Sequence, residues 1–281
     1  MIGVQEKSRR AAALNLSAYS VVALYVLFVV FPILWIALLS VKTEVQAFAD
    51  PPLFIFQPTF ENYYKLFAEE KFGKYLLNSI IIAVSSSVLC LIVGIPMAYA
   101  SARVKTKANK RILVWVLVSR MAPAMTYVIP FFVAFSTLKL IDTHFGLILT
   151  YSTLNLPLVI WLMRSFFLDA SQEVYDAATM DGASAFQTFF RIALPMATPG
   201  ITSTGIIAFV VAWNEFIFAL VLTRRHAVTA QIGIGNLQKY EGTEWGQMAA
   251  GAIILILPAI LIALFISKYF VQGLTSGSTK G

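Results

Sequence analysis

Six long apolar stretches dominate this sequence and decide what the chain can fold into. In order, they are Ser17–Leu39, Leu76–Ala100, Ile112–Leu138, Gly146–Phe167, Gly200–Leu222 and Gln247–Phe270. Each has the ~20 mostly apolar residues that a helix needs to cross the hydrocarbon core of a bilayer. The sequence therefore predicts an all-α, polytopic membrane protein with six transmembrane helices.

Composition excludes an apolar soluble enzyme. Only 12% of the residues are charged and 59% are hydrophobic, whereas soluble domains have about 25% charged residues. With so few charges, a water-soluble fold could not cover its own surface. The net charge of +7 lies mostly in short loops and tails, so we interpret it as a topology signal. We expect membrane lipid around the chain and no nucleic-acid partner.

Prolines interrupt the apolar stretches, and we expect them to kink the helices rather than end them. They are Pro32, Pro96, Pro123, Pro130, Pro157 and Pro258. In a membrane, neighbouring groups can satisfy the backbone atoms that a proline frees. The first stretch is also longer than the apolar run of about 7–15 residues in a signal peptide, so we expect it to be retained as a helix.

A cluster of cations between the second and third stretches sets the expected orientation. Arg103, Lys105, Lys107, Lys110 and Arg111 lie within one short loop, and cytoplasmic loops carry the excess of Lys and Arg. With this loop inside, six spans place both termini in the cytoplasm. The expected parts are an N-terminal tail over 1–16, a transmembrane domain over 17–270 with a long cytoplasmic loop over 168–199, and a C-terminal tail over 271–281.

Two outer segments are longer than tight turns. The first, Val41–Tyr75, contains the amphipathic stretch Phe60–Phe67, whose aromatic side chains suit a membrane interface. The second, Thr223–Gly246, contains several glycines, and we expect it to be a flexible loop.

No pattern in the chain indicates catalysis or a bound cofactor. There is no Gly-x-x-x-x-Gly-Lys-Ser/Thr loop, no Gly-x-Ser-x-Gly and no His-Glu-x-x-His. The single cysteine, Cys90, lies in an apolar run, and we expect His144 and His226 to be solvated loop residues. The chain is therefore expected to be no enzyme and to hold neither a metal nor a cofactor itself.

The inner segment Asp169–Pro199 differs from its surroundings because it is acidic and rich in small residues. We expect two short helices joined at Gly182, with a capping box between Asp169 and Gln172. The side chains expected to be buried are Phe186, Phe189, Phe190 and Ile192. Helices that lie on anionic lipid are usually basic. We therefore interpret this acidic hairpin as a docking element for a soluble partner.

The same segment resembles the EAA loop of permease subunits from binding-protein-dependent ABC importers of the maltose-type carbohydrate uptake family. That family's pattern is Glu-Ala-Ala, three residues, Gly, nine residues and Ile-x-Leu-Pro. The spacing fits, with Asp176 in place of the usual Glu, and Asp181-Gly182-Ala183 matches a form common among sugar permeases. The residues that the resemblance assigns to ATPase coupling are Glu173, Asp176, Ala177, Ala178, Asp181, Gly182, Ala183, Ile192, Leu194 and Pro195.

The resemblance implies a multi-subunit pump in a bacterial-type plasma (inner) membrane. In the family, the EAA loop is a coupling helix seated in a cleft of a separate, homodimeric ATPase, which binds ATP and Mg. A second, homologous permease completes the solute pathway, and an extracytoplasmic binding protein delivers the solute, here expected to be a sugar or sugar derivative.

Two further segments take expected roles from the same resemblance. The C-terminal tail resembles one that contacts the ATPase, through Leu274, Thr275, Ser276 and Gly277. The last outer loop resembles one that reaches into the binding protein, through Gln238, Lys239, Tyr240, Glu241 and Gly242.

Polar residues within the apolar stretches are candidates for the solute pathway. Arg120 either meets the solute, or pairs with a carboxylate or extends to the cytoplasmic surface. Asn214 and Glu215 either line the pathway or bond neighbouring helices. The remaining candidates are Asn78, Tyr127 and Asn155.

Other functions stay open at this point. The EAA pattern also occurs in ABC permeases for non-carbohydrate solutes. An ion-driven secondary transporter would predict internal repeats, and none is visible. A membrane-embedded enzyme lacks any supporting group of residues.

Overall fold

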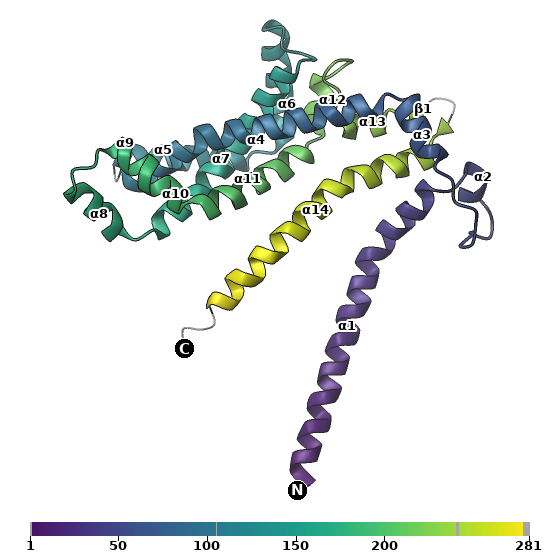
Figure 1. Cartoon of the computed structure of the whole chain (residues 1–281). Coiled ribbons are helices and arrows are strands. Elements are labelled where there is room, and N and C mark those ends of the chain that lie inside the picture. Colours follow the sequence, from purple (N-terminus) through teal and green to yellow (C-terminus); the bar gives the residue numbers. More distant parts are fainter. Residues whose placement is uncertain (1, 105, 240–241, 278–281) are drawn as a thin grey trace. The chain divides into compact units, whose positions relative to one another are not determined.

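The computed structural model describes residues 2–104, 106–239 and 242–277, most of which lie in helices (Figure 1). The chain divides into two units, which are described separately. The first consists of Met1–Glu70 with Asn236–Pro258, and the second of Lys71–Gly235 with Ala259–Gly281.

The first unit consists of a long helix, short helices and a small hairpin. Its elements are α1 (Ile2–Ser40), α2 (Glu44–Ala47), α3 (Glu61–Ala68), the hairpin of β1 (Gln238–Lys239) and β2 (Gly242–Thr243), and the start of α14 (Trp245–Gly277). The strands are antiparallel, with Gln238 opposite Thr243. Asn62 Nδ2 donates to the carbonyl oxygens of Ser40 and Lys42 at 2.9 and 2.8 Å, which ties α3 to the end of α1. The predicted amphipathic stretch is therefore a helix.

The second unit contains the packed helical body. Its elements are α4 (Phe72–Arg103), α5 (Lys107–Met121), α6 (Ala124–Thr137), α7 (His144–Asp169), α8 (Gln172–Met180), α9 (Ala185–Thr188), the π-helix η1 (Phe189–Ala193), α10 (Leu194–Met196), α11 (Thr198–Trp213), α12 (Ile217–Leu222), α13 (Ala230–Gly235) and the remainder of α14.

Close packing of α4 against α7 and α11 forms the core of this unit. Ala98, Val159 and Ala208 are fully buried between these helices. At Gly94, an added Cβ would lie 2.7 Å from Val159 Cγ1. The small residue therefore lets two backbones approach, as is common where helices meet in membranes.

The described residues contain four helices that are long and apolar enough to cross a membrane, or up to six if each bent pair is one span. The four are Ser17–Ser40, Phe72–Arg103, His144–Asp169 and Trp245–Leu264. The bent pairs are α5 with α6, at 97°, and Ala185–Met196 with α11, at 73°. The all-α polytopic fold is confirmed.

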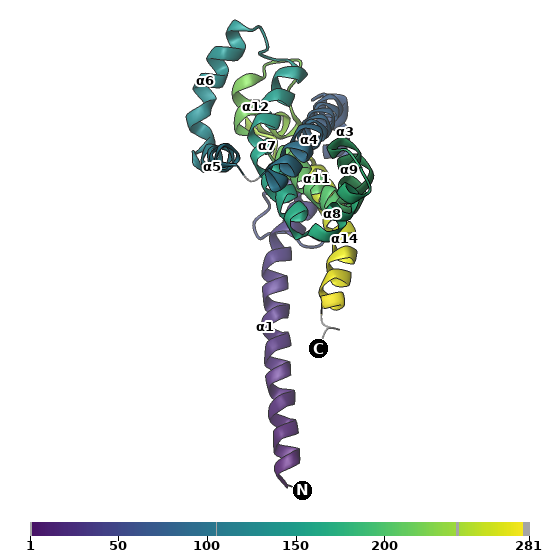
Figure 2. The ribbon, with the colours of Figure 1, turned by 90° about the vertical axis from the view of Figure 1, so that its left-hand side faces the viewer.

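Five of the six prolines lie inside helices as predicted, but the prediction for Pro123 is wrong. There α5 ends and α6 begins, with the sharp bend visible in Figure 2. Ala122 has extended backbone (φ −72°, ψ 138°). A proline disfavours helical backbone in the residue before it, and here no helical turn continues through the pair.

Two further expectations need correction. The fifth apolar stretch is not one helix, because α11 ends at Trp213 and α12 begins at Ile217. The outer segment Thr223–Gly246 is not a simple flexible loop, because it contains α13 and the β1–β2 hairpin.

Candidate functional site

The inner segment forms the predicted pair of short helices at one end of the second unit (Figure 1). Helix α8 buries Tyr175 and Ala178, which are one turn apart and 4% and 5% exposed. The opposite face leaves Asp176 and Ala177 exposed, with Glu173 and Asp181 exposed nearby. The segment thus has an exposed acidic surface with small side chains.

Gly182 makes the turn that separates the two helices. Its φ is +79°, a conformation that side chains with a Cβ rarely adopt, and its amide donates to the Thr179 carbonyl at 3.0 Å. An added Cβ would meet nothing within 4 Å. Within this chain, the glycine is therefore required by backbone conformation, and its surface stays open for close approach.

Three details of the segment differ from the prediction. Asp169 ends α7 and caps nothing, since the N-cap of α8 is Ser171, without a side-chain bond. The capping box is instead at Ser184 and Gln187, where α9 begins. Phe189 is buried as expected and Ile192 is half-buried, but Phe186 is 71% exposed and Phe190 is 48% exposed, and these two rings pack on each other with centroids 4.5 Å apart.

Arg103, in the last turn of α4, attaches α8 to the helical body. Its Nη1 donates to Gln172 Oε1 at 2.6 Å, and its Cζ lies 3.2 Å from the centroid of the Tyr175 ring. Tyr99, one turn earlier, lies against Tyr175 and Phe189 with centroid distances of 6.3 and 5.0 Å. Sequence reasoning used Arg103 only for topology and missed this contact.

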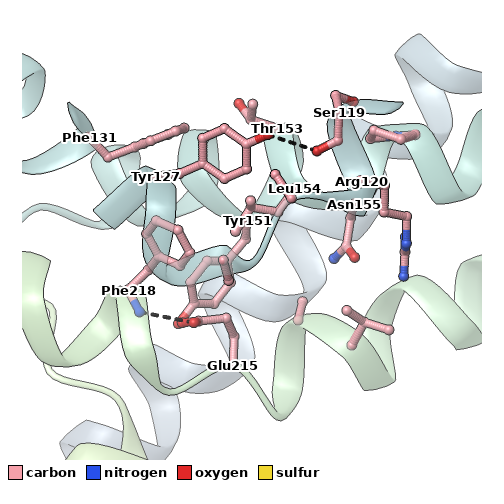
Figure 3. A pocket seen from close by; sticks show the side chains of 15 residues that line it. Ser119, Arg120, Tyr127, Phe131, Tyr151, Thr153, Leu154, Asn155, Glu215 and Phe218 are labelled. Atoms are coloured by element: carbon pink, nitrogen blue, oxygen red, sulfur yellow. Dashed lines mark hydrogen bonds between the residues drawn. The ribbon is translucent and has the colours of Figure 1, made fainter. Parts of the chain in front are cut away.

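The second site is a cavity of about 410 Å³ between α5, α6, α7, α11 and α12 (Figure 3). It brings together four of the six pathway candidates: Arg120, Tyr127, Asn155 and Glu215. Sequence reasoning missed further lining residues, which are Ser119, Phe131, Tyr151, Thr153, Leu154 and Phe218 among others. Tyr151 and Phe218 lie in apolar runs, so no sequence signal marks them.

Some polar atoms that line the cavity have hydrogen-bond partners and others have none within the described part of the chain. Both Glu215 carboxylate oxygens accept backbone amides at the start of α12, from Phe218 at 2.9 Å and Ala219 at 3.2 Å. The Tyr151 hydroxyl lies beside this carboxylate (Figure 3) without a hydrogen bond of ordinary geometry. Asn155 is 2% exposed, donates to the Ala208 carbonyl at 3.3 Å, and leaves its Oδ1 without a partner among the described residues.

Arg120 lies in the last turn of α5 and lines the cavity. Among the described residues it makes no ion pair with a carboxylate. A guanidinium without a carboxylate partner at a cavity wall can donate to oxygen atoms of a bound molecule.

The other two pathway candidates, Asn78 and Asn214, do not line the cavity. Asn78 Nδ2 donates to the carbonyls of His226 and Val228, both at 2.9 Å, and its Oδ1 lies 2.8 Å from His144 Nε2. His144 is therefore a bonded residue of α7, and its prediction as a solvated loop residue is wrong. Asn214 Nδ2 donates to the Val210 carbonyl of its own helix at 2.8 Å.

The remaining predicted contacts lie in elements that the structure describes only in part. Gln238, Lys239 and Gly242 belong to the β1–β2 hairpin, whereas Tyr240 and Glu241 lie outside the described residues. Leu274, Thr275, Ser276 and Gly277 form the end of α14.

Comparison with known proteins identifies relatives for most of the chain. Residues 90–276 match the family described as "Binding-protein-dependent transport system inner membrane component". The chain is 37% identical to a probable ABC transporter permease protein, y4oR, of Sinorhizobium fredii, over 89% of this chain and 90% of that protein. It is 36% identical to the trehalose transport system permease protein SugB of Mycobacterium tuberculosis, over 89% and 92%.

A solved structure shares the fold. It is a bacterial ABC transporter involved in import of the acidic polysaccharide alginate, and one of its chains matches with a TM-score of 0.77 and 22% identity. The match covers 92% of this chain and 96% of that chain.

Proposed function

Because the chain belongs to the family of inner membrane components of binding-protein-dependent transport systems, we propose that it is the permease subunit of an ATP-driven sugar importer. A separate, homodimeric ATPase supplies the energy by binding ATP and Mg. A second, homologous permease completes the pathway, and an extracytoplasmic binding protein delivers the solute.

The observation that carries this proposal is the form of the inner segment. The buried face of helix α8 is held by Arg103 of α4, which lies over the Tyr175 ring, and the opposite face of α8 is exposed. Gly182, at φ +79°, follows the helix. A helix held in this way transmits a push on its exposed face to α4. The family's transport systems are binding-protein-dependent, and a separate ATPase would supply this push, since the sequence contains no phosphate-binding loop.

The cavity supports a sugar as the solute. Its volume of about 410 Å³ falls in the usual range for small-molecule sites. The rings of Tyr127, Phe131 and Phe218 offer apolar faces, and Asn155 Oδ1 and Arg120 offer an acceptor and donors. A sugar presents hydroxyl groups beside apolar C–H faces and complements both. SugB, a relative, is described as a trehalose permease.

The proposal includes a location and an orientation. The chain crosses the inner membrane several times, with both termini and the inner segment in the cytoplasm. The cluster Arg103–Arg111 supports this orientation. The ends of α4 are consistent with it, since Arg103 contacts the inner segment and Asn78 contacts the loop after α12. The chain itself acts as a transport subunit and not as an enzyme.

Reconstitution into vesicles tests this function. The chain, its second permease and its ATPase are reconstituted with the binding protein outside and ATP inside, and uptake of labelled trehalose and of a labelled amino acid is measured. We expect sugar uptake that requires ATP and the binding protein. Uptake that continues without the ATPase, driven by an ion gradient, would identify a secondary transporter. ATP-dependent uptake of the amino acid alone would identify a permease for another solute.

A further inference from the structure

The loop that follows α12 is held by one carboxylate. Asp142, at φ +60° between α6 and α7, accepts hydrogen bonds from the backbone amides of four consecutive residues, Arg224–Ala227, at 2.9–3.1 Å. Its own amide donates to the Leu222 carbonyl at 2.8 Å. Burial alone would raise the pKa of Asp142, but the four amides outweigh it and hold the pKa below its usual value.

The carbonyl groups of the same loop are also engaged. Asn78 donates to the carbonyls of His226 and Val228 at 2.9 Å, and Lys74 Nζ donates to the Arg225 carbonyl at 3.4 Å. Because these backbone groups bond to residues beneath them, the loop has little freedom to move. The side chains of Arg224, Arg225 and His226 are all exposed.

Cations gather around this fixed loop. The outer basic tip consists of Lys74, Lys139, Arg224, Arg225 and His226, all exposed. Asp142 lies at the same end, but its carboxylate faces the loop amides. The other acids described in this unit lie in the inner segment or line the cavity; they are Asp169, Glu173, Asp176, Asp181 and Glu215. The tip therefore keeps a net positive charge, because Asp142 is the single described acid of this unit that faces its two lysines and two arginines.

We propose that the outer basic tip is a docking site for an acidic surface of the extracytoplasmic binding protein. The proposal rests on the proposed function, which places this end outside. Two adjacent guanidinium groups on a fixed loop suit carboxylates, which they can bind in a bidentate manner. A loop that is already ordered also loses little freedom on binding. Anionic lipid headgroups respond to charge density and need no such fixed geometry.

The first test removes the two arginine charges. In the reconstituted complex, one measures the concentration of binding protein that half-maximally stimulates ATP hydrolysis, at several salt concentrations. We expect Arg224→Gln with Arg225→Gln to raise this concentration about 10-fold at low salt, because charges at an interface speed encounter. The difference should vanish near about 0.5 M salt, where charges are screened. Lys110→Gln, an exposed cation at the opposite end, serves as the control and should match wild type.

The second test separates a fixed docking site from general attraction. Asp142→Asn removes a negative charge, so attraction by net charge alone predicts tighter docking. A site that depends on the ordered loop predicts weaker docking, because an amide side chain cannot accept all four backbone donors.

Two results would overturn the proposal. One is a half-maximal concentration that stays at the wild-type value in either variant, and the other is tighter docking in Asp142→Asn. In the first case, weaker binding of the arginine variant to vesicles rich in phosphatidylglycerol would assign the tip to lipid. In each case, uptake at saturating binding protein still tests the proposed function separately.

Discussion

At the scale of single residues, Arg103 has the most specific role. It joins helix α8, the proposed coupling helix, to the long helix α4 through Gln172 and the Tyr175 ring. A cation over an aromatic face contributes about 0.5–2 kcal/mol, and a charge-assisted hydrogen bond adds to it. Tyr99 of α4 also packs on Tyr175, with ring centroids 6.3 Å apart, so α8 is linked to α4 through Arg103 and this aromatic contact.

The first prediction concerns Arg103→Ala. The complex should assemble, but the amount of sugar transported per ATP hydrolysed should fall several-fold because α8 moves without α4. Arg103→Lys should be intermediate, since an ammonium group cannot stack as a plane on Tyr175. Arg111→Ala, which removes an exposed cation of the neighbouring helix α5, is the control. An unchanged transport-to-hydrolysis ratio in Arg103→Ala would remove the proposed role of this contact.

The second prediction concerns Asp142 and pH. Its ionised form is stabilised by four amides, so its pKa is lowered. A lowered pKa gives stability that is complete above the usual aspartate pKa of about 3.9 and is lost as the pH falls through the folded value. Hydrogen exchange, corrected for intrinsic rates, should show equal protection of the Arg224–Ala227 amides at pH 7 and pH 5. Protection that drops between pH 7 and pH 5 would show that the loop's stability does not depend on ionised Asp142 in this way.

At the scale of elements, the packing of α4 on α7 fixes the body. The third prediction is that Gly94→Val lowers the melting temperature of the purified complex in detergent. A Cβ added at Gly94 would lie 2.7 Å from Val159 Cγ1. Valine is a stiff β-branched side chain that has few other rotamers to adopt. Overpacking costs about 1–3 kcal/mol, which corresponds to several degrees. Gly235→Ala, with open space around it, is the control, and equal melting temperatures for both variants would contradict the packing account.

The sequence predicts continuous apolar helices well and their interruptions poorly. The ~20-residue apolar length alone located α1, α4, α7 and α14. It could not show that Pro123 ends a helix, because membrane helices commonly continue through proline. It also missed the break after Trp213, where Glu215 accepts the amides of α12. A carboxylate within an apolar run signals function or helix contact, and only the fold shows that it caps a helix.

For the candidate sites too, the sequence located some features and missed others. Spacing alone located the inner segment and the glycine at φ +79°. Arg103 and Asp142 were not found as structural contacts, since Gln172 lies 69 residues from Arg103 and the amides that bond the Asp142 carboxylate begin 82 residues after it. Asn78 looked like a pathway residue but bonds the loop after α12, because an asparagine in an apolar helix suits either role.

At the scale of the whole molecule, the orientation across the membrane is the first question. The fourth prediction uses cysteine labelling on a Cys90→Ser background, in which serine can keep the bond to the Ser152 carbonyl. Gln238→Cys should react with a membrane-impermeant reagent in intact cells, and Lys110→Cys should react only after permeabilisation. Both positions are exposed in the fold. The reverse pattern would invert the orientation and, with it, the roles of the inner segment and the outer basic tip.

Coupling to an ATPase is the central claim, and Gly182 tests it most directly. Gly182→Asp adds a fourth acid beside Glu173, Asp176 and Asp181, at a position with open space within this chain. Gly182→Asn, of the same size and equally tolerant of positive φ, is the matched control for the charge. Neither change should disturb insertion or pairing with the second permease.

The decisive measurement is the amount of ATPase that co-purifies with each variant, together with ATP hydrolysis stimulated by the binding protein in reconstituted vesicles. The account predicts that Gly182→Asp retains the second permease but loses the ATPase or its stimulated hydrolysis, with Gly182→Asn less affected. Wild-type values for both quantities in Gly182→Asp would contradict the assignment of the inner segment as the coupling surface.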